Sequence, residues 1–137
     1  MIEQIQLRLP AMRRGCHLIT SDILRALPSP LPAAGLLNVF VRHTSCALTI
    51  NENADPDVRT DMARIFDHLV REGEPFYNHT MEGPDDMPAH AKSTLVGASL
   101  TIPIVGGRLG LGTWQGIYLC EFRDYVGPRS LVLTLYS

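Results

Sequence analysis

The sequence predicts an α+β fold: a mainly antiparallel, β-sandwich-like core with about three helices, in a single domain over residues 1–137. Three observations support this prediction. At least five segments alternate apolar and polar residues, as half-buried strands do. Three segments begin with helix-start signals. Strands and helices do not alternate regularly along the chain, which argues against a parallel sheet.

The composition is that of an ordinary globular protein. Apolar residues make up 45% of the 137 residues and charged residues 19%, with a net charge of −2, so we expect a packed core and no nucleic-acid partner. Cys16, Cys46 and Cys120 are odd in number and lack C-x-x-C spacing, which argues against a disulfide framework. The N-terminus has no signal-peptide pattern, and no apolar run approaches the ~20 residues that span a bilayer. We therefore expect a cytoplasmic protein that does not enter a membrane.

The first strands lie on either side of a short helix. Apolar residues alternate with polar ones from Ile5 to Leu9, and Pro10 ends that strand. His17–Ile19 can form a second, short strand, after which Thr20 is a candidate N-cap. Residues 36–50 are mostly strand, with His43 at the end of a line of apolar side chains on one face. His43 is therefore either a site residue or a histidine at the core edge that bonds to the backbone.

Two further helices are expected in the middle of the chain. Asp55 before Pro56 combines a carboxylate cap with proline at the first helical position. Pro88 predicts the first position of another helix that runs to about Val96 and ends at Gly97. Asp85 and Asp86 would then lie just before this helix, where capping alone could explain them.

The last third of the chain predicts three strands. They cover residues 100–104, 117–123 and 131–136, and Pro103 places the first of them at an edge or at a bulge. Glu121 is a carboxylate inside a strongly apolar strand. It must therefore lie on an exposed face or be held by a partner.

A dense polar segment, residues 78–90, is the main candidate for a functional site. His79 and His90 have no evident structural role there, and Asp86 lies between them. With His43 and Glu121 these groups could hold zinc or another divalent ion, or act as general acids and bases without a metal. Four cations could bind phosphate if they converge on the segment: Lys92, Arg108, Arg123 and Arg129. Pairing of Cys46 with His43 as a nucleophile is disfavoured, because residues three apart in one strand face opposite sides.

Three blocks of sequence resemble the YjbQ-like family, whose members are also described as secondary thiamine-phosphate synthase enzymes. The first block is His43-Thr-Ser before Leu48-Thr-Ile-Asn-Glu-Asn53, and the second is Gly83-Pro-Asp-Asp-Met-Pro-Ala-His-Ala-Lys-Ser93. The third runs from Ser99 to the terminal Gly-Thr-Trp-Gln115. The resemblance covers nearly the whole chain. Departures are Cys46, where alanine is common, and Thr80, where an acid is common.

The resemblance implies a homotrimer with a site at or near a subunit interface. For this chain it implies catalytic roles for His43, Asn53, Asp86 and Glu121, and metal binding by His79, His90 and His43, with zinc or magnesium as the ion. It further implies that Thr113, Trp114 and Gln115 contact the substrate, together with the phosphate-binding candidates Lys92 and Arg123.

Three functional hypotheses follow. The resemblance implies a weak thiamine-phosphate-synthase-like activity, which joins a pyrimidine methyl diphosphate to a thiazole phosphate and releases pyrophosphate. The first alternative is a metal-dependent hydrolase that acts on another small phosphorylated metabolite. The second alternative is a non-catalytic trimer that binds a metal or ligand.

Overall fold

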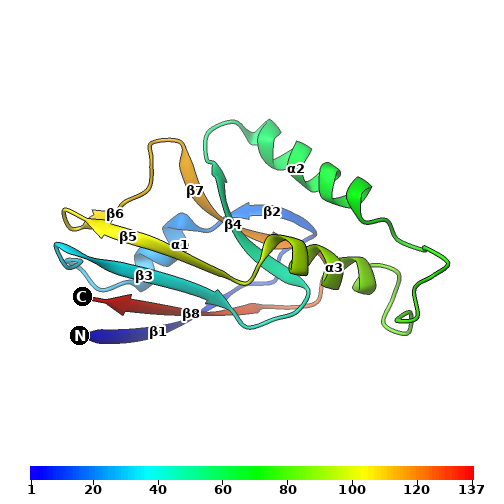
Figure 1. Ribbon diagram of the computed structural model, residues 1–137, viewed down its shortest axis with the longest axis horizontal. Helices are drawn as coiled ribbons and strands as arrows, with labels where there is room; N and C mark the ends of the chain where they lie inside the picture. The colour runs from blue at the N-terminus through cyan, green and yellow to red at the C-terminus, as the bar shows by residue number, and fades with distance from the viewer.

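The computed structural model describes all 137 residues and consists of two antiparallel sheets with three helices (Figure 1). The five-stranded sheet has the order β1 (Ile2–Leu9), β8 (Arg129–Tyr136), β3 (Ala34–Val41), β5 (Ser99–Val105) and β6 (Arg108–Leu109). The three-stranded sheet has the order β2 (Gly15–Leu18), β7 (Gln115–Glu121) and β4 (Cys46–Glu52). The predicted α+β fold with a mainly antiparallel core is confirmed.

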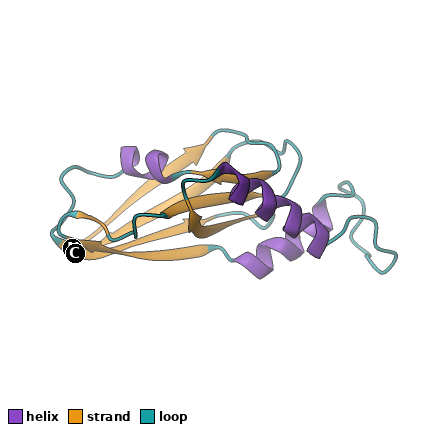
Figure 2. Cartoon of the chain, turned by 90° about the horizontal axis from the view of Figure 1, so that it is seen from above, coloured by secondary structure: helices purple, strands orange, loops and turns teal.

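The helices cover the three-stranded sheet unevenly. α1 (Thr20–Ala26) lies near β1 and β7, whereas α2 (Pro56–Leu69) packs on β2 and α3 (Asp86–Val96) packs on β4. Figure 2 shows α2 and α3 side by side at one end of the molecule, with α1 at the other. None of the three helices is long and apolar enough to cross a membrane.

The main core lies between the two sheets. In β3 the side chains of Leu37, Val39 and Val41 are buried, while Leu36 and Phe40 on the opposite face are exposed, as the alternation predicted. The buried apolar side chains of this core come from both sheets and from α1. They are Leu9, Ile19, Ile23, Leu27, Leu37, Val39, Val41, Cys46, Leu48, Ile102, Ile104, Ile117, Leu119, Leu131, Leu133 and Leu135. Each fully buried leucine or isoleucine stabilises the fold by about 1.5–3 kcal/mol.

A smaller core lies on the other face of the three-stranded sheet, beneath α2 and α3. Ala47, Ala89, Cys120 and Phe122 are buried there, and Phe66 of α2 packs edge-on against Phe122 with ring centroids 5.4 Å apart. This packing fixes α3 against β4, so that its first turn lies beside the beginning of that strand.

Two predicted helix starts need correction. Thr20 is the first residue of α1 and not its N-cap, because its hydroxyl accepts a hydrogen bond from the Ile117 N–H of β7. α3 begins at Asp86 and not at Pro88, since proline is tolerated throughout the first turn, where its missing N–H has no helical partner. By contrast, the Asp55 cap with Pro56 at the start of α2 is confirmed, and Gly97 with a φ of 113° follows the last residue of α3.

Pro103 lies where the sequence predicted, in a strand that is only partly covered. β5 pairs along its length with β3, but on its other side β6 covers only Ile104 and Val105. The Pro103 carbonyl accepts a hydrogen bond from Gly110 N–H at 2.7 Å. Because the N–H and C=O of a residue in an antiparallel strand point to the same side, the missing N–H of Pro103 costs no hydrogen bond to β3.

Candidate metal centre

The start of α3 brings two polar side chains of the predicted segment onto one helix face. Asp86 and His90 are four residues apart, a spacing that places side chains next to each other on a helix. Gly83, with a φ of 103°, turns the chain just before the helix. The loop that precedes this turn returns His79 to the same place.

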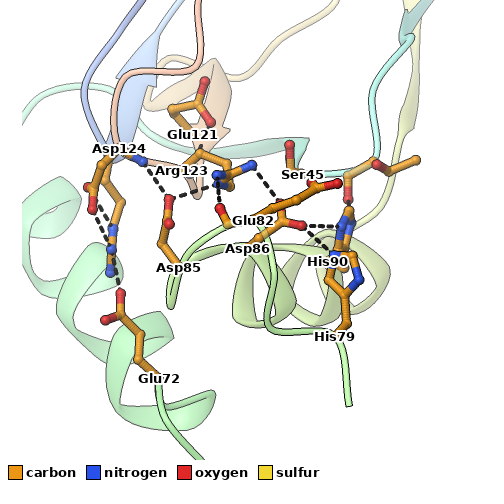
Figure 3. Close-up of polar contacts among 12 residues, drawn as sticks. Ser45, Glu72, His79, Glu82, Asp85, Asp86, His90, Glu121, Arg123 and Asp124 are labelled. Carbon is orange, nitrogen blue, oxygen red and sulfur yellow. Dashed lines mark hydrogen bonds and ion pairs between the residues drawn. The ribbon is translucent and has the colours of Figure 1, made fainter. Parts of the chain in front are cut away.

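His79, Asp86 and His90 form a compact cluster (Figure 3). His79 Nε2 lies 2.5 Å from Asp86 Oδ2, and His90 Nε2 lies 3.1 Å from the same oxygen. One ligand atom from each of the three residues lies within 4.8 Å of the others. The Asp86 side chain is 2% exposed, whereas those of His79 and His90 are 43% and 31% exposed. The cluster therefore consists of one buried carboxylate and two imidazoles that solvent can reach.

A backbone carbonyl fixes the orientation of the His90 ring. His90 Nδ1 lies 2.9 Å from the Thr44 carbonyl oxygen, which can only accept a hydrogen bond. This contact assigns the proton to Nδ1. In the neutral ring, Nε2 then carries a lone pair directed toward the Asp86 carboxylate.

Arg123 holds the two adjacent aspartates from the other side. Its Nε lies 2.8 Å from Asp85 Oδ2, its Nη1 lies 2.6 Å from Asp86 Oδ1, and its Nη2 donates to the Glu82 carbonyl oxygen at 2.9 Å. Burial would raise the pKa of Asp86, but the hydrogen bond with His79 and the charge of Arg123 outweigh it and lower that pKa. Asp86 is thus held as a carboxylate, the form that binds metal.

A second carboxylate, Glu121, lies in a fully buried ion pair. Arg129 Nε and Nη2 lie 2.7 and 2.6 Å from the two oxygens of Glu121, and the Glu121 residue is 0% exposed. Arg129 Nη2 also donates to the Ser45 hydroxyl at 2.9 Å, and Arg123 N–H donates to Glu121 Oε2 at 3.1 Å. Of the two alternatives for Glu121, an exposed face or a partner, the structure shows a partner, Arg129. The contacts of Glu121 are therefore structural.

The structure does not bring His43 into the cluster of potential ligands. His43 Nε2 accepts a hydrogen bond from Ser130 N–H at 2.8 Å, as expected for a histidine at the core edge. Burial and the charges of Arg129 and Arg42 lower the pKa of His43, which keeps the ring neutral. The expectation that His43 ligates the same ion as His79 and His90 is corrected for this chain, because its one lone pair is already used.

Other predicted site residues lie elsewhere or are already bound. Lys92 is 1% exposed, bonds to Asp67 at 2.8 Å, and lies 5.2 Å from the centre of the Phe122 ring. It therefore links α2 to α3 and is not free to bind phosphate. Each of the three guanidinium nitrogens of Arg123 donates one hydrogen bond, and two of these bonds support Asp85 and Asp86 in place of the predicted phosphate contact.

Asn53 and the segment Gly112–Gln115 form a separate structural unit. Asn53 Nδ2 donates to the carbonyl oxygens of Thr113 and Gln115 at 3.2 and 3.1 Å, and Asn53 N–H donates to that of Trp114 at 2.9 Å. This unit lies at the Glu52 end of β4 and β7, whereas the cluster lies near the Cys46 end. At about 3.3 Å per residue the two ends are roughly 20 Å apart. The structure does not bring this segment to the cluster in a single chain.

Two parts of the site do not follow from the sequence patterns. The Thr44 carbonyl that orients His90 is a backbone group, so its side-chain identity gives no signal. The bridge from Arg123 to both aspartates joins segments 37 and 38 residues apart, so sequence spacing predicts only a free cation there. The four-residue spacing of Asp86 and His90 predicts that both side chains lie on one helix face, provided that both belong to the helix. A helix that starts at Pro88 excludes Asp86 and hides this signal.

These features define a class: a small two-sheet α+β protein with a His–Asp–His cluster at the start of its last helix. The family described as UPF0047 protein YjbQ-like matches residues 3–137. The chain belongs to this family.

Relatives and solved structures agree with that assignment. The chain is 47% identical to UPF0047 protein YjbQ of Escherichia coli O157:H7 over 133 residues, or 96% of each chain, and 50% identical to that of Salmonella typhimurium over 123 residues, or 89% and 88%. The crystal structure of hypothetical protein APE1520 from Aeropyrum pernix K1 has a TM-score of 0.88 at 32% identity, over 98% of both chains. A YjbQ/UPF0047 structure from Clostridium acetobutylicum has a TM-score of 0.85 at 36% identity, over 96% of this chain and 99% of that one. These names state no activity.

Proposed function

We propose that this protein is a metal-dependent enzyme that acts on a small phosphorylated metabolite, with the ion held by His79, Asp86 and His90. One observation carries the proposal: two imidazole Nε2 atoms face the same buried carboxylate oxygen, while the Thr44 carbonyl binds the other nitrogen of His90. Metal-binding histidines commonly donate their second N–H to a backbone carbonyl in this way. In a neutral His90 the lone pair of Nε2 faces the Asp86 carboxylate, and the two repel each other unless a cation lies between them.

The donor set favours zinc over magnesium. Two imidazole nitrogens and one carboxylate oxygen suit zinc and related transition ions, whereas magnesium prefers oxygen ligands. Three protein ligands with an accessible fourth side are typical of catalytic sites, and both histidines are partly exposed. We therefore assign the cofactor as zinc or a similar ion.

A cleft beside the cluster provides room for a metabolite. It has a volume of about 760 Å³, and its walls include His79, Arg71, Phe76 and Tyr77. Arg71 makes no ion pair within the chain, so its guanidinium is free to bind phosphate oxygens. The exposed Phe76 ring offers an apolar surface for a flat ring system.

The thiamine-phosphate-synthase-like reaction is the first one to test. A divalent ion bound at the cluster would supply positive charge to a departing pyrophosphate. In this chain Arg71 would hold phosphate oxygens, and the Asp85–Asp86–Arg123 network would hold the ligands in place. The diphosphate leaves from an activated, benzylic-type carbon, so a protein nucleophile is not required.

Hydrolysis of another phosphorylated metabolite is the second candidate. The partial exposure of His79 and His90 favours it, because water can reach the position opposite Asp86. Under this alternative the ion would lower the pKa of a bound water.

A direct assay separates these possibilities. Zinc-loaded protein is incubated with the pyrimidine methyl diphosphate and the thiazole phosphate, and thiamine phosphate is measured by fluorescence after oxidation to thiochrome. A panel of phosphorylated metabolites is assayed in parallel for phosphate release. We expect activity in one assay that His79→Ala and His90→Ala each abolish, while His17→Ala, a control on β2 outside the cleft, retains it. Zinc binding without any activity sensitive to these variants would support the non-catalytic alternative.

We further propose that the protein acts in the cytoplasm as a homotrimer that uses the outer face of the five-stranded sheet. All three cysteines are free thiols, as is usual for cytoplasmic proteins. The outward positions of β3, β5 and β8 carry no charged side chain and expose Leu36, Phe40 and Tyr136. Light scattering after size exclusion would give a trimer mass, and Phe40→Glu would reduce it to that of one chain. A monomer before the substitution would contradict this assembly.

A further inference from the structure

Two cysteines that the proposed function does not use lie directly opposite each other in neighbouring strands. Cys16 in β2 is the register partner of Cys120 in β7, and their Sγ atoms are 3.9 Å apart. Ile19 N–H donates to the Ile117 carbonyl at 2.9 Å, so alternation along the ladder makes Cys16 and Cys120 a non-hydrogen-bonded pair. In such pairs the Cα atoms are only about 4.5 Å apart, which lies within the range that a disulfide spans.

Closing this pair requires only a small movement. The two sulfur atoms must approach by about 2 Å to reach the disulfide bond length of about 2.0 Å. β2 has only four residues and lies at the edge of its sheet, so it can shift without breaking a second ladder. The pairing therefore needs no rearrangement of the core between the sheets.

The surroundings of Cys16 favour a negatively charged reagent. Cys16 is partly exposed and lies in a groove of about 300 Å³ between β2 and α2, whose walls include Arg13, Arg59 and Arg64 and no carboxylate. A hydrogen bond from the Cys120 thiol lowers the pKa of Cys16, whereas the same bond and then burial raise that of Cys120. Cys16 is thus the attacking thiolate and Cys120 the resolving thiol.

We propose that Cys16 and Cys120 form a redox-active pair that small anionic disulfides of the glutathione type oxidise to an intramolecular disulfide. In the first step the Cys16 thiolate attacks one sulfur of the reagent, forms a mixed disulfide and releases one thiolate. In the second step the Cys120 sulfur attacks Cys16 Sγ, forming the Cys16–Cys120 bond, while its proton passes to the departing sulfur, which leaves as the second thiol. The protein loses two electrons, and the reagent gains them as two thiols.

The third cysteine provides an internal control. Cys46 is 1% exposed and lies in the core between the sheets, whereas Cys120 faces the smaller core beneath α2 and α3. Burial raises the pKa of Cys46 to about 12, and its register partner in β7 is Glu121 rather than a cysteine, so it has no thiol to pair with. Cys46 can reach neither the groove nor the pair.

Oxidised glutathione is the test reagent, added to the full chain at neutral pH, followed by peptide mapping under non-reducing conditions. We expect a Cys16–Cys120 peptide, a free Cys46 and full reversal by dithiothreitol. Cys46→Ala should leave this result unchanged, and Cys120→Ala should trap a stable glutathione adduct on Cys16. Three free thiols in the folded wild-type protein, or a persistent adduct on its Cys16, would overturn the proposal.

Cystamine, a cationic disulfide, tests the role of charge. The rate at which each reagent reacts with Cys16 is divided by its rate with a free small thiol. This ratio corrects for the intrinsic reactivity of the reagent. The arginine-lined groove predicts a normalised rate about tenfold higher for oxidised glutathione at low salt, decreasing as salt is added. Equal normalised rates would overturn the assignment to an anionic reagent.

Discussion

The Glu121–Arg129 pair and the His79–Asp86–His90 cluster both hold a buried carboxylate among nitrogen groups, but only one of them is complete. Both oxygens of Glu121 are bound by Arg129, and the pair is closed to solvent. Asp86 has one oxygen bound by Arg123, while the other faces two imidazoles that reach the surface.

This difference separates a structural ion pair from a candidate site. In the closed pair every charge has a protein partner with fixed geometry, so nothing remains for a ligand to do. In the open cluster the His90 ring is fixed through Nδ1, which leaves its Nε2 lone pair without a suitable protein donor. Breaking the closed pair should cost stability, whereas breaking the open cluster should cost metal affinity.

The largest effect on stability is expected from Arg129→Met. This substitution leaves the Glu121 carboxylate buried without its partner, and we expect a loss of about 3–5 kcal/mol in the free energy of unfolding, measured with urea. Arg25→Met is the matched control, because Arg25 pairs with Asp22 while 71% exposed, and should change stability by less than about 1 kcal/mol. The double variant Glu121→Leu with Arg129→Met should recover most of the loss. A loss below about 1 kcal/mol for Arg129→Met alone would show that the pair is not structural.

Asp86→Asn should act mainly on metal affinity. The amide keeps the shape of the side chain but loses the negative charge, so we expect zinc affinity to fall by at least about 100-fold. Competition with a chromophoric chelator measures this change. Asp61→Asn, an exposed position on α2, should leave zinc affinity unchanged. Equal affinity for wild-type protein and Asp86→Asn would place the ion elsewhere.

His90→Gln should separate affinity from stability. His90 is partly exposed, so its replacement should lower zinc affinity by at least about tenfold while it changes the apo protein's stability by no more than about 1 kcal/mol. Chelator competition and urea unfolding of the same preparations give both numbers. A large stability loss with unchanged affinity would make His90 structural, like Arg129.

The smallest expected effect is the pH dependence that His43 contributes. Its pKa is lowered in the folded state, so the unfolded chain binds the proton more readily as pH falls through about 6.5. His43 therefore contributes stability that is present above this pH and is lost below it. The stability difference between wild type and His43→Gln should shrink from about pH 8 to about pH 5. A difference that grows toward low pH would contradict a lowered pKa.

Much of the fold could be predicted from local patterns. The alternation in β3 and the Asp55 cap of α2 are short-range signals, and the structure has them as predicted. The start of α3 was misplaced because proline is accepted at several first-turn positions, and the local pattern does not distinguish them.

The site was predicted only where its residues are close in sequence. His79, Asp86 and His90 fall within one polar segment, and the fold joins them. Asn53 follows from motif membership alone, and His43 from its place at a strand end as well, but neither signal fixes spatial position. His43 is instead bonded to the backbone of Ser130, and Asn53 lies near the other end of its sheet. The Glu121–Arg129 pair depends on tertiary contacts that sequence spacing does not encode.

The most direct test of a metal centre at His79, Asp86 and His90 is an anomalous-difference map, collected at the zinc absorption edge from crystals grown with zinc. We predict one dominant peak at about 2.0–2.2 Å from His79 Nε2, His90 Nε2 and an Asp86 carboxylate oxygen. A map without a peak among these three residues, or with peaks only at other surface histidines, would contradict the account.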